Sequence, residues 1–339
     1  MHEDSNIHSG VKVPGRLVPF PASISPEARA ALKRLVGPDG APLNNLDLPA
    51  ADDFAGWDAA SKKVNAFMAQ IRPNFDDAHS APVETLDMGG AVVYVANPPD
   101  TVPDDRVYLE IHGGAFAHGD GEVCRIGART QAHLHGVRCY AVDYRRPPRH
   151  PYPAPLDDCV AAYRGLLQRY PPESIVIGGA SAGGNLAAAT VLRARDEGLP
   201  LPAALVLPSP ALDLTESGDS RQTNRFIDVM LPNPDEAIGL LYAGGHDLTH
   251  PNLSPLFGDF SKGFPPTLIQ AGTRDVLLSD VARMSQALRR AGVPVVLIIA
   301  EGMPHGGFMG APEDLEIAAE IRQFAASHWG RRAATERKR

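Results

Sequence analysis

The sequence of 339 residues is poor in cysteine, with only Cys124, Cys139 and Cys159, and it contains no C-x-x-C spacing. Three cysteines in this arrangement argue against a disulfide framework and against a structural zinc site. Long hydrophobic runs are also missing, because the longest, residues 293–300, contains Pro294 and is far shorter than the roughly 18 residues that a membrane span requires. We expect no membrane span and, since no apolar signal segment is visible, a cytoplasmic protein.

A surplus of positive charge is absent as well. The chain has 32 lysines and arginines against 40 acidic residues, which gives a net charge of −8. Nucleic-acid binding depends on clustered cations, so the composition disfavours a nucleic-acid partner. The one basic cluster lies at residues 331–339, which we expect to be a disordered tail.

Short runs of β-branched residues alternate with helical patterns from about residue 83 onward. Such alternation is typical of a mostly parallel sheet covered by helices, which is an α/β fold. We predict eight strands, at residues 83–87, 92–96, 107–111, 138–142, 174–177, 204–207, 267–270 and 295–299, and helices at residues 123–135, 155–170, 182–197, 279–291 and 312–329.

Two regions depart from this alternation. Residues 1–80, with helical patterns at 26–35 and 53–71, precede the first strand. Residues 213–254 separate the sixth and seventh strands by more than a simple crossover needs. We predict that residues 1–80 and 213–254 form one helical cap, as an N-terminal segment and an insertion, over a core made of residues 81–212 and 255–330.

One serine, Ser181, stands in the segment GGASAGG between a predicted strand and a predicted helix. Only small neighbours allow a strand, a sharp turn and a helix to approach so closely, and such a turn holds the hydroxyl at the carboxyl edge of the sheet. A glycine-rich turn without chemistry and a phosphate-binding loop are the alternatives. The G-x-G-x-x-G and G-K-[ST] patterns that nucleotide sites require are not present, so the segment favours a nucleophilic serine.

A serine hydroxyl needs a base to take its proton and a carboxylate to orient that base, and the expected chain order is Ser, then Asp or Glu, then His. Of the twelve histidines, His305 follows the last predicted strand, where the geometry requires the base. Asp275 follows the seventh strand and is the predicted carboxylate. Asp280 is its rival, but it lies near the start of a helix, where an acid commonly interacts with the helix dipole.

The segment HGGAF follows the third predicted strand directly. We predict that the backbone amides of Gly113, Gly114 and Ala182 hold the negative oxygen that develops during acyl transfer. His112 is expected to stabilise this loop through hydrogen bonds. Phe116 is a candidate wall of the substrate pocket, and plain packing under the cap is the alternative.

With these motifs the chain resembles the α/β-hydrolase fold in its hormone-sensitive-lipase-like branch, the bacterial esterases with an HGGG-type loop. The resemblance covers about residues 80–328 and implies a serine carboxylesterase that acts on small esters through an acyl-enzyme and needs no metal or organic cofactor. A lactonase, amidase or thioesterase with the same residues, and a non-catalytic ligand-binding protein, remain alternatives, and a homodimer is expected only by analogy. Further similarity lies in VDYR (142–145), HPYPAP (150–155), SPALDL (209–214), LSPL (253–256), FPPTLIQ (264–270) and GMPH (302–305).

Four positions depart from the family pattern. Ala180, which we expect to face the substrate, stands where the family usually has Asp or Glu, and this removes a charge beside the pocket. Ala115 replaces the third glycine of HGGG, and Val276 replaces the proline after the acid. The histidine is followed by residues 306–308, one residue more than in the common H-x-F pattern. None of these changes removes a predicted catalytic group.

Overall fold

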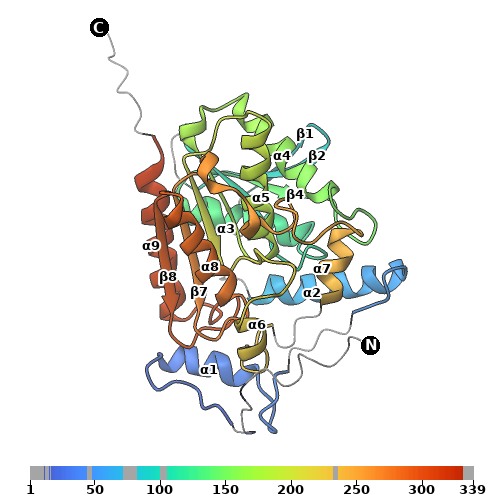
Figure 1. The fold of residues 1–339 in the computed structure, drawn as a ribbon, viewed down its shortest axis with the longest axis vertical. Helices are drawn as coiled ribbons and strands as arrows, with labels where there is room; N and C mark the ends of the chain where they lie inside the picture. The colour runs from blue at the N-terminus through green and yellow to red at the C-terminus, as the bar shows by residue number, and fades with distance from the viewer. Residues whose placement is uncertain are drawn as a thin grey trace.

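The computed structural model describes residues 17–43, 48–71, 82–99, 105–231 and 236–330, together with Val11 and Gly15 (Figure 1). Within these residues one eight-stranded sheet has the order β1-β2-β4-β3-β5-β6-β7-β8. The pairs β1–β2 and β2–β4 are antiparallel, and every other pair is parallel. This confirms the predicted α/β fold. The strands are β1 (Val83–Met88), β2 (Ala91–Ala96), β3 (Val107–Ile111), β4 (Arg138–Asp143), β5 (Ile175–Gly179), β6 (Ala204–Pro208), β7 (Thr267–Gly272) and β8 (Val295–Ala300).

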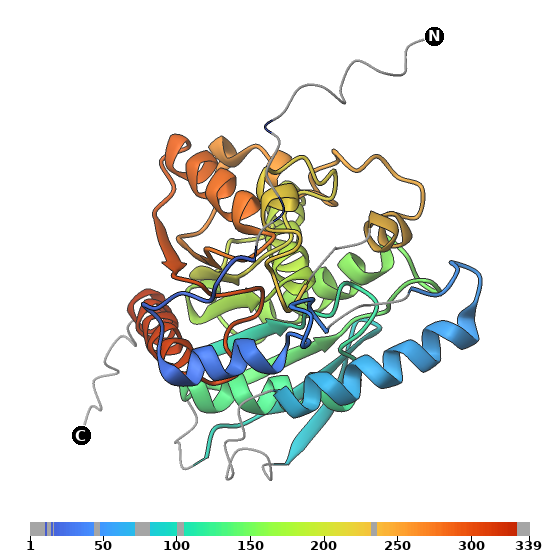
Figure 2. The same cartoon turned by 90° about the horizontal axis from the view of Figure 1, so that it is seen from below.

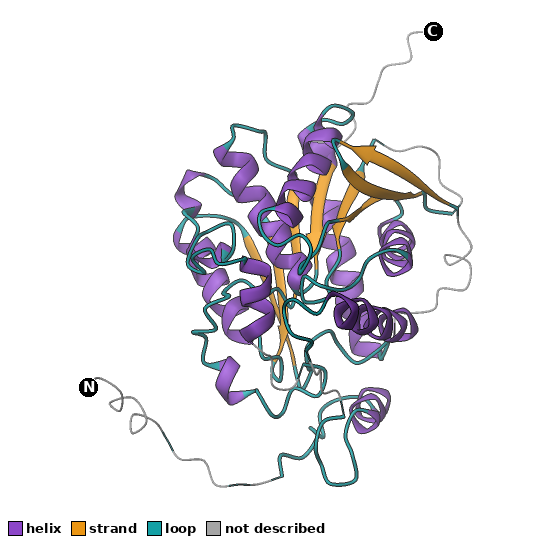
Figure 3. Ribbon diagram, turned by 90° about the vertical axis from the view of Figure 1, so that its right-hand side faces the viewer, coloured by secondary structure: helices purple, strands orange, loops and turns teal. Residues whose placement is uncertain are grey.

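Helices cover both faces of this sheet (Figure 3). Alternating side chains of each central strand point to opposite faces, so that Leu109 of β3 belongs to one core cluster and its neighbour Tyr108 belongs to another. The helices are α1 (Pro26–Arg34), α2 (Phe54–Ile71), α3 (Glu122–His135), α4 (Ala154–Leu167), α5 (Ala182–Asp196), α6 (Ser220–Thr223), α7 (Glu236–Ala243), α8 (Leu278–Arg290) and α9 (Pro312–His328). The predicted helix at residues 155–170 ends at Leu167, three residues early.

Strand β5 is longer than the sequence pattern predicts, because it includes Gly178 and Gly179. Both glycines stand where side chains cannot fit. A Cβ at Gly178 would overlap the hydroxyl of Tyr108, and one at Gly179 would lie 2.7 Å from the carbonyl oxygen of Ile111. Because these two positions are glycine, Tyr108 and Ile111 of β3 can pack closely against β5, and the strand continues almost to the serine.

The two N-terminal helices lie against the core beside α9 and α3 (Figure 2). Helix α1 packs into a cluster with Met303 and Phe308, which lie in the loop after β8. Helix α2 contacts the loop after β3, where Ser61 Oγ donates to the Ala117 carbonyl at 3.0 Å and Asn65 Oδ1 accepts from the Gly119 amide at 2.7 Å. The region before β1 thus supports two loops at the carboxyl edge of the sheet.

Helices α6 and α7 fall within residues 213–254, the predicted cap insertion. Parts of both predicted cap regions, and the predicted tail at residues 331–339, lie outside the described residues. None of the helices within the described residues has both the length and the apolar character that a membrane span requires.

Candidate active site

Ser181 occupies the turn between β5 and α5 with a positive φ of +58° and a ψ of −123°. This conformation is strained for a residue with a side chain, and packing around it must hold it in place. A Cβ at Gly184 would lie 2.7 Å from Pro210, so the glycines are needed for the close approach of the next loop. Ala182 begins α5, and its amide is among those at a helix start that have no acceptor within the helix.

Three side chains predicted from the sequence come together at the carboxyl ends of β5, β7 and β8. His305 Nε2 lies 3.0 Å from Ser181 Oγ, and His305 Nδ1 lies 3.3 Å from Asp275 Oδ1. Asp275 is fully buried and also accepts a hydrogen bond from the Leu277 amide at 2.8 Å. The His305 side chain keeps 14% of its surface exposed. The arrangement is a continuous series of hydrogen-bonding groups from a buried carboxylate to an accessible hydroxyl.

The electrostatics of this series favour a charged imidazole beside a charged carboxylate. Burial alone would lower the pKa of His305, but the charge of Asp275 and the hydrogen bond to it raise that pKa above its usual value. Burial would likewise raise the pKa of Asp275, and the charge and hydrogen bond of His305 instead lower it. Asp275 is therefore ionised at neutral pH, where it can stabilise an imidazolium.

The loop after β3 passes directly beside the serine. A Cβ built on Gly113 would lie 3.4 Å from Ser181 Cβ, and Gly114 adopts φ +118°. Ala115 and Phe116 also have positive φ values, +51° and +63°, which are uncommon for residues other than glycine. The loop is thus tightly coiled, and Ala115 adopts a glycine-like conformation where the family pattern has glycine.

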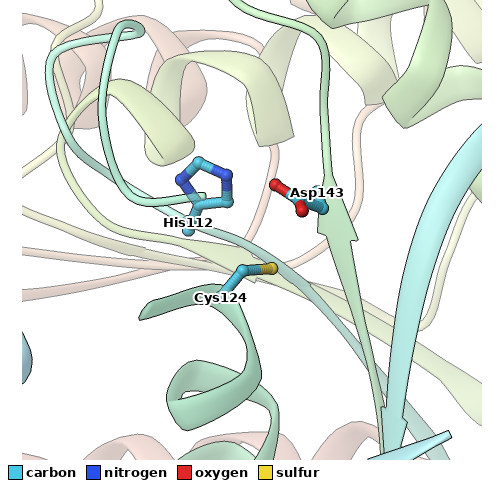
Figure 4. A group of neighbouring side chains, drawn as sticks. All are labelled: His112, Cys124 and Asp143. Carbon is cyan, nitrogen blue, oxygen red and sulfur yellow. The ribbon is translucent and has the colours of Figure 1, made fainter. Parts of the chain in front are cut away.

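His112 stabilises this loop through a hydrogen bond and a ring contact. Its Nδ1 lies 2.8 Å from the Gly113 carbonyl, its ring stacks on Tyr144 with centroids 4.1 Å apart, and the Tyr144 hydroxyl donates to the His112 carbonyl at 3.0 Å. Figure 4 shows His112 with Cys124 and Asp143, whose potential ligand atoms all lie within 4.8 Å of one another. Imidazole, thiolate and carboxylate are donors that zinc accepts. Among the described residues this is the one group with such spacing.

Two predicted substrate contacts differ in their accessibility. Ala180, next to Ser181, is exposed. Phe116 is only 3% exposed, and its ring stacks on Tyr242 of α7 with centroids 4.0 Å apart and an interplanar angle of 2°. This contact agrees with the packing alternative for Phe116, because one face of its ring is covered by Tyr242.

The rival carboxylate, Asp280, has a different environment. It is fully buried, accepts hydrogen bonds from the amides of Leu212 and Asp213 at 2.8 and 3.2 Å, and lies 3.5 Å from Arg221. Burial raises its pKa to about 6 although the charge of Arg221 opposes the change. Asp280 therefore fixes the loop after β6, and the carboxylate that meets the imidazole is Asp275.

One acidic residue at the site was missed in the sequence. Asp228, in the insertion between α6 and α7, is fully buried, and its carboxylate contacts the backbone amides of Val276 and His305. The acid of such a site is expected just after a strand, and Asp228 does not directly follow a predicted strand. The pattern carried no signal that could have found it.

Comparison with known proteins identifies the class. Residues 108–309 match the model of a family described as alpha/beta hydrolase fold. The chain belongs to this family, and its similarity to esterases of the bacterial hormone-sensitive lipase family confirms the predicted branch. A serine at a sharp turn between a strand and a helix is a recurrent feature of this fold.

Similar curated proteins include an acetyl-hydrolase of Streptomyces hygroscopicus, 41% identical over 57% of this chain, and an esterase of Acinetobacter venetianus, 36% identical over 66% of it. The aligned part spans 64% of the acetyl-hydrolase and 75% of the esterase. Among solved structures, esterase E25 aligns over 95% of this chain and 99% of its own, with 34% identity and a TM-score of 0.84. An esterase from the bacterial hormone-sensitive lipase family aligns over 91% of this chain and 100% of its own, with 31% identity and a TM-score of 0.78.

Proposed function

We propose that this protein is a serine carboxylesterase that hydrolyses small carboxylic esters through an acyl-enzyme intermediate. The observation that carries the proposal is the 3.0 Å contact between Ser181 Oγ and His305 Nε2, with Asp275 at the other ring nitrogen. A nucleophile, a base and an orienting carboxylate in this order are what acyl transfer requires.

In the first half of the reaction Ser181 Oγ attacks the ester carbonyl carbon while His305 Nε2 takes the hydroxyl proton. The carbonyl oxygen becomes an oxyanion, which the amides of Gly113, Gly114 and Ala182 stabilise. The carbon–oxygen bond to the alcohol then breaks, and the alcohol leaves with the proton from His305. This step yields an acyl-serine and a neutral imidazole.

In the second half His305 takes a proton from a water molecule, whose oxygen attacks the acyl carbon. The bond to Ser181 breaks as the protonated imidazole returns its proton to Oγ, and the carboxylic acid is released. Asp275 stays ionised throughout and stabilises the imidazolium twice, which agrees with the lowered pKa of this carboxyl.

Small neutral acyl groups are the substrates that the surroundings favour. Ala180 leaves no side-chain charge beside the serine, and Phe116 and Tyr242 fill space near the loop that would hold the oxyanion. The name of the acetyl-hydrolase relative supports an acetyl-sized acyl group. Matched acetyl, butyryl and octanoyl esters of one alcohol, with the corresponding amide and lactone, would establish the preference.

A fluorophosphonate probe tests the proposed nucleophile directly, because it reacts with activated serines. We expect one adduct, located at Ser181 by peptide mapping, and the loss of both adduct and ester hydrolysis in Ser181→Ala. An intact, folded protein that forms no adduct and hydrolyses no ester would refute the proposal.

The remaining expectations concern assembly and location. Strand β8, labelled in Figure 1, forms one edge of the sheet. Its residues Val296, Leu297 and Ile299 are 41–42% exposed, and these apolar residues support the proposed homodimer. Light scattering on the purified protein would test it. The cytoplasmic location stays a prediction of the sequence.

A further inference from the structure

Asp228 lies in the insertion between α6 and α7, away from every strand, and yet it reaches the loops that carry the imidazole and its carboxylate. Its side chain is fully buried. Asp228 Oδ1 accepts hydrogen bonds from the amides of Met230 and Leu231 at 3.0 and 3.1 Å, which closes a local turn. These bonds orient the carboxylate from its own side of the site.

The opposite side of the carboxylate contacts two other segments. The Val276 amide donates to Asp228 Oδ2 at 3.0 Å, and the His305 amide lies 3.2 Å from both carboxylate oxygens. Val276 directly follows Asp275. One side chain therefore joins the loop after β7 to the loop after β8, at the residues that must keep a fixed spacing for the imidazole to reach Ser181.

We propose that Asp228 is a positioning residue for the proposed ester hydrolysis: its carboxylate holds the backbones of Val276 and His305 in register and places a second negative charge beside the imidazole. The insertion would then act on the chemistry through this contact, in addition to any role in enclosing the substrate. The inference rests on the proposed function, because the register matters only if His305 serves as the base.

The charges around the imidazole agree with this role. Burial and the charge of Arg221 lower the pKa of His305, whereas the charge of Asp275, the hydrogen bond to it and the charge of Asp228 raise it above its usual value. Burial and the charge of Asp275 raise the pKa of Asp228 to about 6, so this carboxyl is ionised at neutral pH and above. The imidazolium formed during the reaction is thus stabilised from the side of the insertion as well as from Asp275.

A purely structural role must be separated from this one, because the same turn also packs. Val229, next to Asp228, is 4% exposed and lies in a cluster with Leu32 of α1, Met303 and Phe308. Val229→Ala loosens the turn without touching the carboxylate. It is therefore the matched control for changes to the charge.

The test compares Asp228→Asn with Val229→Ala and the wild-type protein. Asparagine keeps the size, but it has no charge, and its amino group would face donors that require an acceptor. We expect kcat of Asp228→Asn to fall about tenfold to a hundredfold, since small misplacements of reacting groups have effects of this size. We also expect the acidic limb of the kcat/KM profile to move to lower pH, because the lost negative charge lowers the pKa of His305. Val229→Ala should lower the melting temperature and leave the acidic limb of the kcat/KM profile at the pH of the wild-type protein.

The value of kcat is calculated per molecule of folded protein that reacts with the fluorophosphonate probe. If Asp228→Asn does not fold, Asp228→Ser takes its place as the neutral variant. Wild-type kcat in the neutral variant, or a lower kcat with the unmoved limb of Val229→Ala, would overturn the inference. These outcomes differ from failure of the proposed function, in which the wild-type protein itself hydrolyses no ester and forms no adduct at Ser181.

Discussion

The substitution Gly183→Ala tests whether close packing around the serine is needed for the proposed chemistry. Gly183 lies in the first turn of α5, and a Cβ built there would lie 2.6 Å from the His112 carbonyl oxygen and closer still to that of Ile111. Real Cβ atoms essentially never come within 3.0 Å of such an atom. Both neighbours are backbone atoms that lead into the loop of Gly113, so the added methyl group must push that loop away from the serine.

The required displacement sets the size of the effect. Moving backbone by about 0.5–1 Å takes the Gly113 amide out of the position proposed for oxyanion binding, and misplacements of about 1 Å can cost on the order of 100-fold in rate. Overpacking a buried site costs about 1–3 kcal/mol of unfolding free energy. The better helix propensity of alanine returns about 0.5–1 kcal/mol. We therefore expect a kcat loss of about 100-fold in a protein that remains folded.

The assay is steady-state hydrolysis of a p-nitrophenyl ester, with urea unfolding of the same samples. Gly239→Ala is the matched control, because Gly239 also lies in a helix and its added Cβ would meet nothing within 4 Å. This control should keep wild-type kcat and be equally or more stable. If Gly183→Ala also keeps wild-type kcat, then the contact between α5 and the loop after β3 does not position the proposed oxyanion site, and the reasoning is wrong.

Three further results are expected. Asp275→Asn should lower kcat by about 10⁴-fold while circular dichroism stays unchanged, because the amide leaves the imidazole in the wrong tautomer; a small loss would exclude the proposed carboxylate role. The kcat/KM profile of the wild-type protein should fall on acidification with a midpoint above pH 6.5, because the base must be neutral and Asp275 raises the pKa of His305 above that value; a midpoint below 6.5 would contradict this. Tyr242→Phe should leave the free energy of unfolding nearly unchanged, because the buried hydroxyl has no hydrogen-bond partner among the described residues. Tyr242→Ala removes the ring stacked on Phe116 and should cost about 3–5 kcal/mol in urea unfolding. Similar losses in the two variants would show that the hydroxyl, and not the ring, stabilises the fold.

The strand and helix pattern could be predicted because it is written in local sequence. Alternation of β-branched runs with helical spacing placed the strands to within two residues of their observed ends. The end of β5 was missed because Gly178 has low strand propensity. Position 178 of β5 must be glycine because the side chain of Tyr108, on the neighbouring strand β3, leaves no room for a Cβ.

The environment of Phe116 illustrates a different limit. The sequence placed this aromatic ring next to a glycine-rich loop and left two roles open. The structure stacks it on Tyr242, which is 126 residues further along the chain and belongs to the insertion. Which surface an aromatic side chain covers depends on where an insertion folds back, and no local pattern encodes that position.

The sequence by itself determined the succession of strands and helices along the chain and which residues follow the strands at their carboxyl ends, since parallel strands joined by helices bring those ends to one edge. Tertiary structure alone decided that Ser181 and His305, 124 positions apart, meet at 3.0 Å, and that Asp228 joins the loops beneath them. The physical reason is that loop conformation, such as the positive φ of Ser181, is imposed by atoms distant in the chain, whereas periodicity reports only on neighbours.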